Sequence, residues 1–221
     1  FVDTRLQRDV DRIAAGLPAG VGVYVQHLVT GCGAARDADS RFPAASTLKV
    51  AILVDAVRRG QARRLRSVLD RMVIESSDEA ANAVLASLGG GSGERGAALV
   101  TQTMRDLGLT RSLVRRPYLT EDARRPLPIE AGAAPALFTN FISTPFELAR
   151  LMVAVHRGAA GRGGVARLGI GARAARAELL ARLIDTRDGS KLVAGVPRYV
   201  PVAHKTGYTE EVKHDAGVLY L

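Results

Sequence analysis

The stretch STLKVAILVDAVRR, residues 46–59, contains neither Gly nor Pro and is mostly apolar. Such a run predicts a buried helix that begins at Ser46, because Ser is a favoured residue at a helix start. Working outward from it, hydrophobic spacing predicts further helices over residues 3–15, 63–72, 78–87, 93–106, 144–156 and 173–185. Most of the predicted helices therefore lie in the middle of the chain.

Strand patterns lie near the two ends instead. In residues 21–29, VGVYVQHLV, the side chains alternate as in a β-strand, and a TGCG turn follows. A second β pattern, YVPVAHKTGY, covers residues 199–208, and the apolar segment HDAGVLYL follows at 214–221. We therefore predict an α/β fold of the α+β, two-lobe kind, with an antiparallel sheet from the chain termini, flanking helices and an inserted, mostly helical lobe. The expected units are a sheet lobe, residues 1–45 and 188–221, and a helical lobe, residues 46–187.

Composition argues against several classes of function. The net charge is +9, but only four of the 31 basic residues are Lys, and 5% aromatic residues leave little for bases to stack on, so we expect no nucleic-acid partner. One Cys and four scattered His give no usual zinc-ligand spacing, so we expect no metal and no cofactor. No apolar run approaches the roughly 18 residues of a membrane span, and the first residues lack a signal-peptide pattern.

Ser46 and Lys49 stand three residues apart on the predicted helix, so that a hydroxyl and an amine share one face. Serine attacks poorly as a neutral alcohol and needs a neighbouring base. A desolvated lysine near a second cation can be neutral enough to serve as that base, and Lys205 is a candidate for the cation. The pair predicts nucleophilic catalysis by Ser46 with Lys49 as the proton acceptor.

A second motif, Lys205-Thr206-Gly207, lies on the predicted strand 199–208. With four Lys, 12 Thr and 23 Gly in 221 residues, chance supplies about 0.02 such tripeptides. The Lys and Thr offer a cation and a hydroxyl to a carboxylate, and the Gly permits a close approach of substrate backbone. The alternative is a strand that ends in a polar turn with a solvated Lys.

Three segments, in this order, resemble the motifs of the class A β-lactamases and penicillin-binding proteins: RFPAASTLKVAIL at 41–53, ESSDEAANAVL at 75–85 and VPVAHKTG at 200–207. The similarity runs through most of the 221 residues. It implies the β-lactamase/transpeptidase-like two-lobe fold, with the active site in the cleft between the lobes. It also implies an exported, periplasmic or extracellular protein whose ligand is a small β-lactam or a D-Ala-D-Ala-like peptide.

Carried over residue by residue, the resemblance implies that Ser46 is the nucleophile, Lys49 a base and Ser76 a proton shuttle to the leaving nitrogen. The oxyanion hole would use the backbone amides of Ser46 and Tyr208, each worth roughly 3–4 kcal/mol in the transition state. The positions that would bind substrate are Asp78, Lys205, Thr206, Gly207 and Tyr208.

The middle motif departs from the family pattern. Aligned on the AAN of 80–82, it reads Ser76-Ser77-Asp78, so Asp78 stands where the family usually has Asn. A carboxylate only accepts hydrogen bonds, so a side-chain amide carbonyl of a substrate would lose the donor that Asn provides. A frame that uses Ser77 as the shuttle stays open, and either Ser also suits the cap of the next helix.

A second departure concerns release of the acyl group. Class A enzymes activate water with a loop Glu-x-x-x-Asn, and this chain has no such pattern. The stretch 109–144 lacks a sustained period and is an expected border of the active site. Its candidates for the deacylation base, among which the spacing gives no preference, are Glu121, Asp122, Glu130 and Asn140. Its candidates for residues that brace the loop are Arg115, Arg116 and Tyr118.

Three functions fit these observations. The first is a class A-like β-lactamase that opens β-lactam amides through an acyl-serine intermediate. The second, suggested by the missing loop Glu, is a penicillin-binding D,D-peptidase or esterase with slow deacylation. The third is a non-catalytic binding protein with the same fold. We expect a monomer, and because the family continues past its third motif with a strand and a closing helix, we expect a truncated C-terminus.

Overall fold

The computed structural model describes residues 2–119 and 140–221. The elements in chain order are α1 (Thr4–Ala15), β1 (Val23–Gln26), β2 (Gly33–Arg36), β3 (Phe42–Pro43), the 3-10 turn η1 (Ala45–Leu48), α2 (Lys49–Arg58), α3 (Arg66–Ile74), α4 (Asp78–Leu88), α5 (Gly93–Asp106), β4 (Leu113–Val114), β5 (Phe141–Ser143), α6 (Pro145–Ala159), α7 (Gly163–Arg167), α8 (Ala172–Ala174), the π-helix η3 (Ala175–Leu180), α9 (Ala181–Ile184), the 3-10 turn η4 (Val193–Gly195), β6 (Val202–Tyr208) and β7 (Lys213–Leu219).

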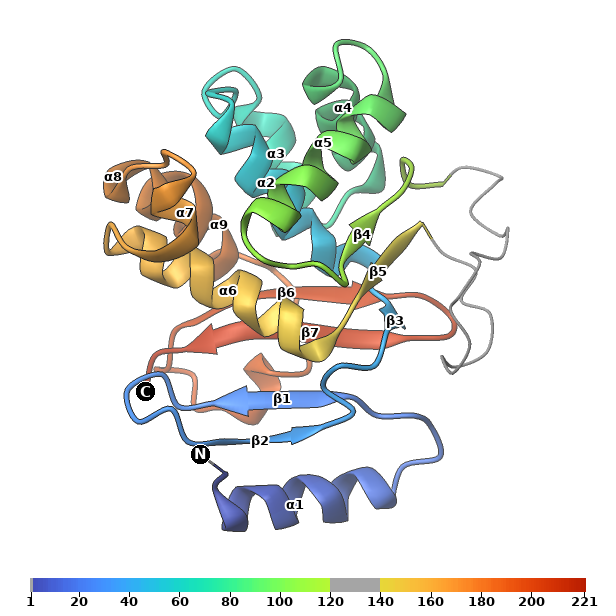
Figure 1. Ribbon diagram of the computed structural model, residues 1–221, viewed down its shortest axis with the longest axis vertical. Coiled ribbons are helices and arrows are strands. Elements are labelled where there is room, and N and C mark those ends of the chain that lie inside the picture. The colour runs from blue at the N-terminus through green and yellow to red at the C-terminus, as the bar shows by residue number, and fades with distance from the viewer. Residues whose placement is uncertain (1, 120–139) are drawn as a thin grey trace.

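The strands form three small antiparallel sheets. β1 pairs with β2, β6 pairs with β7, and β5 pairs with both β3 and β4. In Figure 1 the two terminal hairpins lie below the helices, and α1 packs against β2 at the bottom of the molecule. The mixed helix-and-strand class and the antiparallel pairing are confirmed. The single terminal sheet that the sequence predicts is instead divided into two hairpins.

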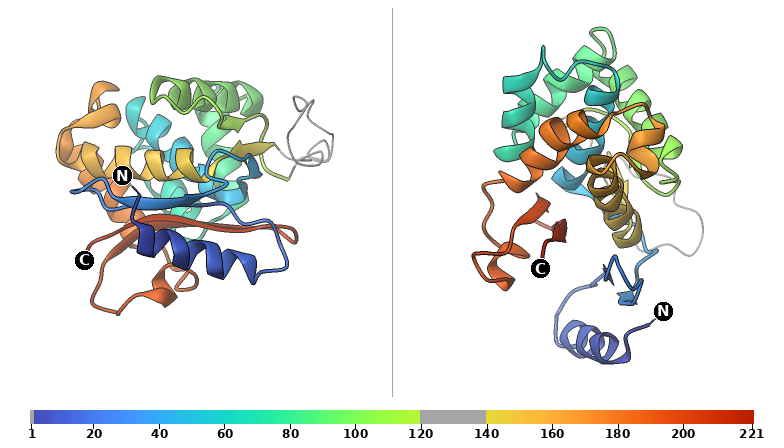
Figure 2. Two further views of the ribbon diagram at one scale, coloured as in Figure 1. Left: turned by 60° about the horizontal axis from the view of Figure 1, so that its bottom comes forward. Right: turned by 90° about the vertical axis from the view of Figure 1, so that its left-hand side faces the viewer.

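Helix α6 packs against both terminal hairpins. It packs against both β1 and β7, and Figure 2 shows the hairpins well apart below it. Among the described residues the two hairpins share no hydrogen-bond ladder, so they do not form one continuous sheet. Side-chain packing on α6 holds this layer together. The division into lobes at residues 45/46 and 187/188 stays a prediction.

Helix α2 is the centre of the helical part. Its residues from Lys49 to Val57 are all buried, and it packs against α3, α4, α5 and α6. Apart from Lys49 and Asp55 this buried part is apolar, as in a helix that lies inside a core, so the buried helix predicted from residues 46–59 is confirmed. Its start differs from the prediction, because η1 precedes α2 and Ser46 makes no capping hydrogen bond.

The other predicted segments also contain helices. Residues 173–185, predicted as one helix, divide into α8, η3 and α9. The sequence did not predict α7 or the sheet β3-β5-β4, because strands of two or three residues are too short to show an alternation. Within the described ranges, every helix is too short or too polar to cross a bilayer.

Candidate active site

The Ser46 hydroxyl and the Lys49 amine meet where η1 leads into α2. Lys49 Nζ lies 2.9 Å from Ser46 Oγ, within hydrogen-bond distance. Ala45, just before the serine, has a φ of 48°, in the left-handed region that is costly for a residue with a Cβ. Strands β5, β6 and β7 all pack against η1, and this packing holds the turn. The contact is the one that the three-residue spacing predicts.

Lys49 is fully buried, and besides Ser46 its nitrogen contacts oxygens of two residues, Ser76 and Asp78. Its Nζ lies 2.6 Å from Asp78 Oδ1, and it also donates to the backbone carbonyl of Ser76. Burial lowers the pKa of Lys49 below its usual value, and the ion pair with Asp78 opposes that shift without cancelling it. The amine is therefore easier to deprotonate than an exposed lysine would be.

Ser76 stands between the two buried lysines. Its Oγ accepts a 2.9 Å hydrogen bond from Lys205 and lies 3.5 Å from Lys49 Nζ. Its φ of 60° places the hydroxyl there by an unusual backbone turn just before α4. Ser77, the other candidate shuttle, caps α4 instead, because its Oγ accepts from the backbone amide of Ala80 at 3.1 Å. Of the two frames, only the one with Ser76 puts a hydroxyl beside Lys49.

Lys205 comes from β6, at the opposite side of the site from α4. Its side chain is fully buried, and its Nζ also donates to the Thr206 carbonyl at 3.0 Å. Burial first, and the neighbouring charge of Lys49 second, lower the pKa of Lys205 to about 8. The charge of Lys49 therefore acts on Lys205, while an effect of Lys205 on the pKa of Lys49, as expected of a second cation, stays a prediction.

Gly207 brings β6 against the segment that carries Ser46. A Cβ on this glycine would lie 2.9 Å from the Ala44 carbonyl oxygen and 3.0 Å from a methyl carbon of Thr47. From the sequence, this glycine is predicted to let substrate backbone approach closely. The structure shows that the close approach is to the protein's own chain, and it fixes the distance between β6 and η1.

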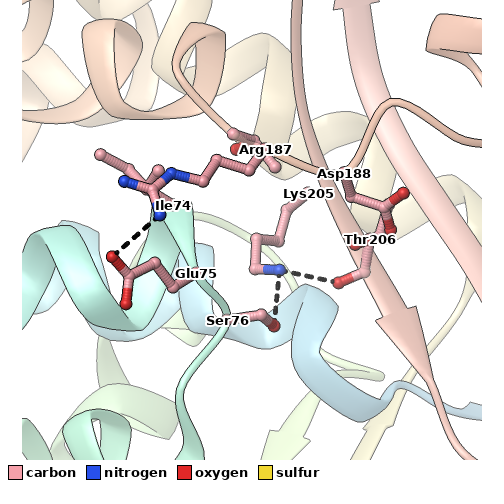
Figure 3. A pocket seen from close by; sticks show the side chains of 8 residues that line it. Ile74, Glu75, Ser76, Arg187, Asp188, Lys205 and Thr206 are labelled. Atoms are coloured by element: carbon pink, nitrogen blue, oxygen red, sulfur yellow. Dashed lines mark hydrogen bonds and ion pairs between the residues drawn. The ribbon is translucent and has the colours of Figure 1, made fainter.

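A pocket of about 470 Å³ opens beside these groups. Figure 3 shows the Lys205 ammonium between Ser76 and Thr206 on its wall, and an ion pair between Arg187 and Glu75 at 3.3 Å bridges the opposite side. The lining residues are Ile74, Glu75, Ser76, Thr186, Arg187, Asp188, Lys205 and Thr206. The pocket is therefore built from the end of α3, the segment after α9 and the middle of β6.

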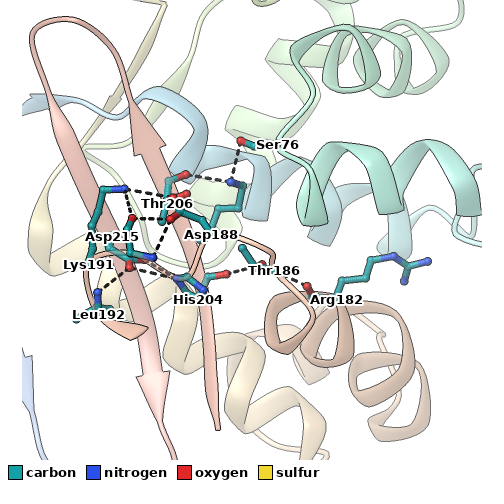
Figure 4. Close-up of polar contacts among 11 residues, drawn as sticks. Ser76, Arg182, Thr186, Asp188, Lys191, Leu192, His204, Thr206 and Asp215 are labelled. Atoms are coloured by element: carbon teal, nitrogen blue, oxygen red, sulfur yellow. Dashed lines mark hydrogen bonds and ion pairs between the residues drawn. The ribbon is translucent and has the colours of Figure 1, made fainter. Parts of the chain in front are cut away.

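Buried polar contacts fasten the segment after α9 to the hairpin β6-β7. Asp215 lies 3.0 Å from Nδ1 of His204 and accepts from the Leu192 amide at 3.1 Å (Figure 4). Thr186 donates to the His204 carbonyl at 3.1 Å. Within the segment itself, near the surface, the carboxylate of Asp188 accepts from Ser190, which lowers the pKa of Asp188. The sequence analysis did not single out this support, because its members are scattered along the chain and form no motif.

Tyr118 lies beside the predicted nucleophile and base. Its ring centroid is 4.7 Å from Lys49 Nζ and its ring stacks on Phe141 at 3.9 Å. Asn82 holds its backbone on both sides, donating to the Tyr118 carbonyl at 2.9 Å and accepting from its amide at 2.7 Å. Burial, followed by the charge of Asp78, raises the pKa of the phenol, which therefore stays protonated. The sequence proposed only that Tyr118 braces a loop.

The remaining predicted residues are placed as follows. Asn140 is buried next to β5, and its carbonyl accepts from the Arg115 amide at 2.8 Å. Tyr208 ends β6 with an exposed side chain, and its backbone follows the segment packed on η1, so its part in an oxyanion hole stays a prediction. Three candidates, Glu121, Asp122 and Glu130, lie outside the described residues.

Solved structures with this fold include enzymes and a penicillin-binding protein. A point mutant of PBP-A, in an acyl-enzyme complex with penicillin G, has a TM-score of 0.78 and 24% identity over 100% of this chain and 84% of its own. A β-lactamase from Streptosporangium roseum has a TM-score of 0.77 and 20% identity over 98% and 84%. An ancestral class A β-lactamase has a TM-score of 0.75 and 20% identity over 98% and 85%. At these identities the likeness establishes the fold.

A match to a family model shows which protein family the chain belongs to, which the fold alone does not. No curated protein matches the chain. The model described as the β-lactamase enzyme family matches residues 5–67 and 58–221, which together span nearly the whole sequence. The chain therefore belongs to the β-lactamase enzyme family.

Proposed function

We propose that this protein is an active-site serine hydrolase that cleaves an amide or ester bond through an acyl group carried on Ser46. The observation that supports it most is the 2.9 Å contact between Ser46 Oγ and Lys49 Nζ inside a buried polar cluster. A lysine whose pKa is lowered by burial can lose its proton and then take one from a neighbouring hydroxyl. The proposed ligand is a small β-lactam or a D-Ala-D-Ala-like peptide. We further propose that the protein is exported and acts as a monomer.

The proposed reaction has two steps. Ser46 Oγ attacks the carbonyl carbon while neutral Lys49 accepts its proton, and the amides of Ser46 and Tyr208 hold the negative oxygen that forms. Ser76, within reach of both lysines, passes a proton to the leaving nitrogen or oxygen, and the bond to it breaks. Lys205 and Thr206 hold a carboxylate of the substrate. Water then cleaves the acyl ester and restores the Ser46 hydroxyl.

The second step separates a β-lactamase from a penicillin-binding peptidase or esterase. Rapid hydrolysis of the acyl ester needs a base that activates water. The Tyr118 ring, whose phenol stays protonated, lies 4.7 Å from Lys49 Nζ, and the sequence lacks the loop Glu-x-x-x-Asn of the class A enzymes. This favours the second of the sequence-based functions, a peptidase or esterase from which an opened β-lactam leaves slowly.

A time course of intact-protein mass after mixing with benzylpenicillin tests both parts of the proposal. We expect a penicilloyl adduct that persists for minutes or longer, that maps to Ser46 by peptide analysis, and that is absent from the Ser46→Ala variant. Fast nitrocefin turnover with immediate return to free enzyme would favour the β-lactamase instead. Labelling by neither benzylpenicillin nor a fluorophosphonate would leave the non-catalytic binding protein as the remaining function.

A further inference from the structure

One carboxylate oxygen of Asp78 has no protein partner among the described residues. Asp78 begins α4 and its side chain is 32% exposed. Its Oδ1 is bonded to Lys49 at 2.6 Å. Its Oδ2 makes no hydrogen bond within residues 2–119 and 140–221. Because an ionised carboxylate only accepts hydrogen bonds, this oxygen can be satisfied by a donor on a bound substrate.

The position of this carboxylate restricts where that donor sits. Asp78 Oδ1 and Ser46 Oγ lie 2.6 Å and 2.9 Å from the same Lys49 nitrogen, so they are at most 5.5 Å apart. In an α-amino acyl group, the amine nitrogen lies about 2.5 Å from the carbonyl carbon. A charge-assisted hydrogen bond adds about 2.8 Å. Oδ2 is the other oxygen of the same carboxylate, so an amine on the carbon next to the attacked carbonyl can reach it while Ser46 contacts the carbonyl.

Charge balance favours a cation at the same place. The proposed attack requires a neutral Lys49, and in that state the ion pair that Lys49 makes with Asp78 is lost. A protonated amine on the substrate then restores a positive partner for Asp78 and helps Lys49 to lose its proton. An acylated amine lacks the charge and keeps a single N–H. It also brings a carbonyl oxygen that the carboxylate repels.

From this geometry, and resting on the proposed acyl-serine function, we propose that Asp78 makes the enzyme select substrates with a free amine next to the scissile carbonyl. The substrate class is that of amino-acyl amides and esters, and their N-acylated counterparts, benzylpenicillin included, acylate Ser46 more slowly. Asp78 is then the specificity-determining residue, while Ser46 and Lys49 act on both kinds of substrate.

Matched chromogenic substrates test the proposal. Alanine p-nitroanilide and N-acetylalanine p-nitroanilide, each in D and L form, differ only in the acylation of the amine within each pair. We expect the ratio of kcat/KM, free amine over N-acetyl, to be about tenfold or more for the better isomer in wild type. In Asp78→Asn the ratio falls by about tenfold or more, because the amide no longer supplies a negative charge.

The ratio is the informative readout because loss of Asp78 also changes Lys49, and that change affects both substrates alike. Glu79→Gln is the control, since Glu79 is an exposed acid one residue further along α4. Its ratio is expected to equal that of wild type. Circular dichroism checks folding, and Asp78→Ser replaces the Asn variant if the latter does not fold.

The outcomes separate this proposal from the proposed function. A wild-type ratio near one, a preference for the N-acetyl substrates, no anilide cleavage by an enzyme that still labels with a fluorophosphonate, or a ratio unchanged in Asp78→Asn would each overturn the selection by Asp78. Failure of the fluorophosphonate to label Ser46 would overturn the serine hydrolase itself.

Discussion

The Asp78 carboxylate lies 2.6 Å from the Lys49 ammonium, so the predicted general base is held in an ion pair before any substrate binds. Lys49 is fully buried, whereas about a third of the Asp78 side chain is exposed. Burial lowers the pKa of Lys49 and the pair with Asp78 raises it, and burial is the stronger effect. The resting charge of the base therefore depends on the balance between burial and one residue of α4.

Removing the charge of Asp78 is expected to lower the pKa of Lys49 further. In Asp78→Asn, desolvation acts without the opposing ion pair, so Lys49 becomes neutral at lower pH. The acidic limb of the pH profile for Ser46 labelling by a neutral fluorophosphonate should therefore move to lower pH. Glu79→Gln should move it less, because Glu79 acts on Lys49 only through a weaker charge interaction. An acidic limb that does not move in Asp78→Asn would contradict this account of the pair.

Deprotonation of Lys205 is expected to weaken the binding of a substrate carboxylate at alkaline pH. Its pKa is lowered to about 8, so the side chain is charged below that pH and becomes neutral as the pH rises through it. The second-order rate of acylation by benzylpenicillin, which carries a carboxylate, should fall above about pH 8. Labelling by a neutral fluorophosphonate should not show this fall. Equal alkaline behaviour of the two reagents would show that Lys205 does not hold the carboxylate.

A carboxylate in place of Tyr118 is expected to speed the release of an opened β-lactam. The Tyr118 ring lies 4.7 Å from Lys49 Nζ, so Tyr118→Glu places a base beside the acyl-serine and its lysine. The penicilloyl adduct should then decay about tenfold faster or more, as measured by mass spectrometry. Tyr118→Phe, which removes only the hydroxyl, is the control and should leave the decay rate unchanged. A decay rate in the Glu variant equal to that of wild type would argue against the ring as the barrier to release.

The contact of Gly207 with η1 predicts a specific effect on stability. A Cβ there would meet the Ala44 carbonyl oxygen at 2.9 Å, and neither backbone segment can shift easily within the packed turn. Gly207→Ala should lower the free energy of unfolding by about 1–3 kcal/mol and slow Ser46 labelling as well. Gly20→Ala is the control, because nothing lies within 4 Å of its added Cβ. Urea titrations of both variants make the comparison, and equal midpoints would refute the steric role of Gly207.

The sequence predicted the parts that depend on long, regular patterns. Helix α2 follows from a mostly apolar run without Gly or Pro, and α4, α5 and α6 follow from helical spacing. The meeting of Ser46 with Lys49 follows from a three-residue separation on one helical turn. Lys205 was first a candidate cation beside Lys49, and only the family resemblance supported its proximity, since a contact across 129 residues with Ser76 has no local signature.

The features that the sequence did not predict depend on tertiary packing. The sheet β3-β5-β4 consists of strands too short for periodicity, and it is formed by pairing between distant segments. Tyr118 reaches the site because Asn82, 36 residues away, holds its backbone. A motif search marks Asn82 only as part of the middle motif and gives no reason to connect it with Tyr118.

The dependence of Ser46 labelling on Lys49 tests the central claim most directly. The rate of modification by a fluorophosphonate is to be measured in wild type and in Lys49→Met, with peptide mapping of the adduct and circular dichroism to confirm the fold. We predict a single adduct on Ser46 in wild type and a rate lower by about 100-fold or more in the folded Lys49→Met variant. An adduct on another residue, or an undiminished rate without the amine, would contradict the claim.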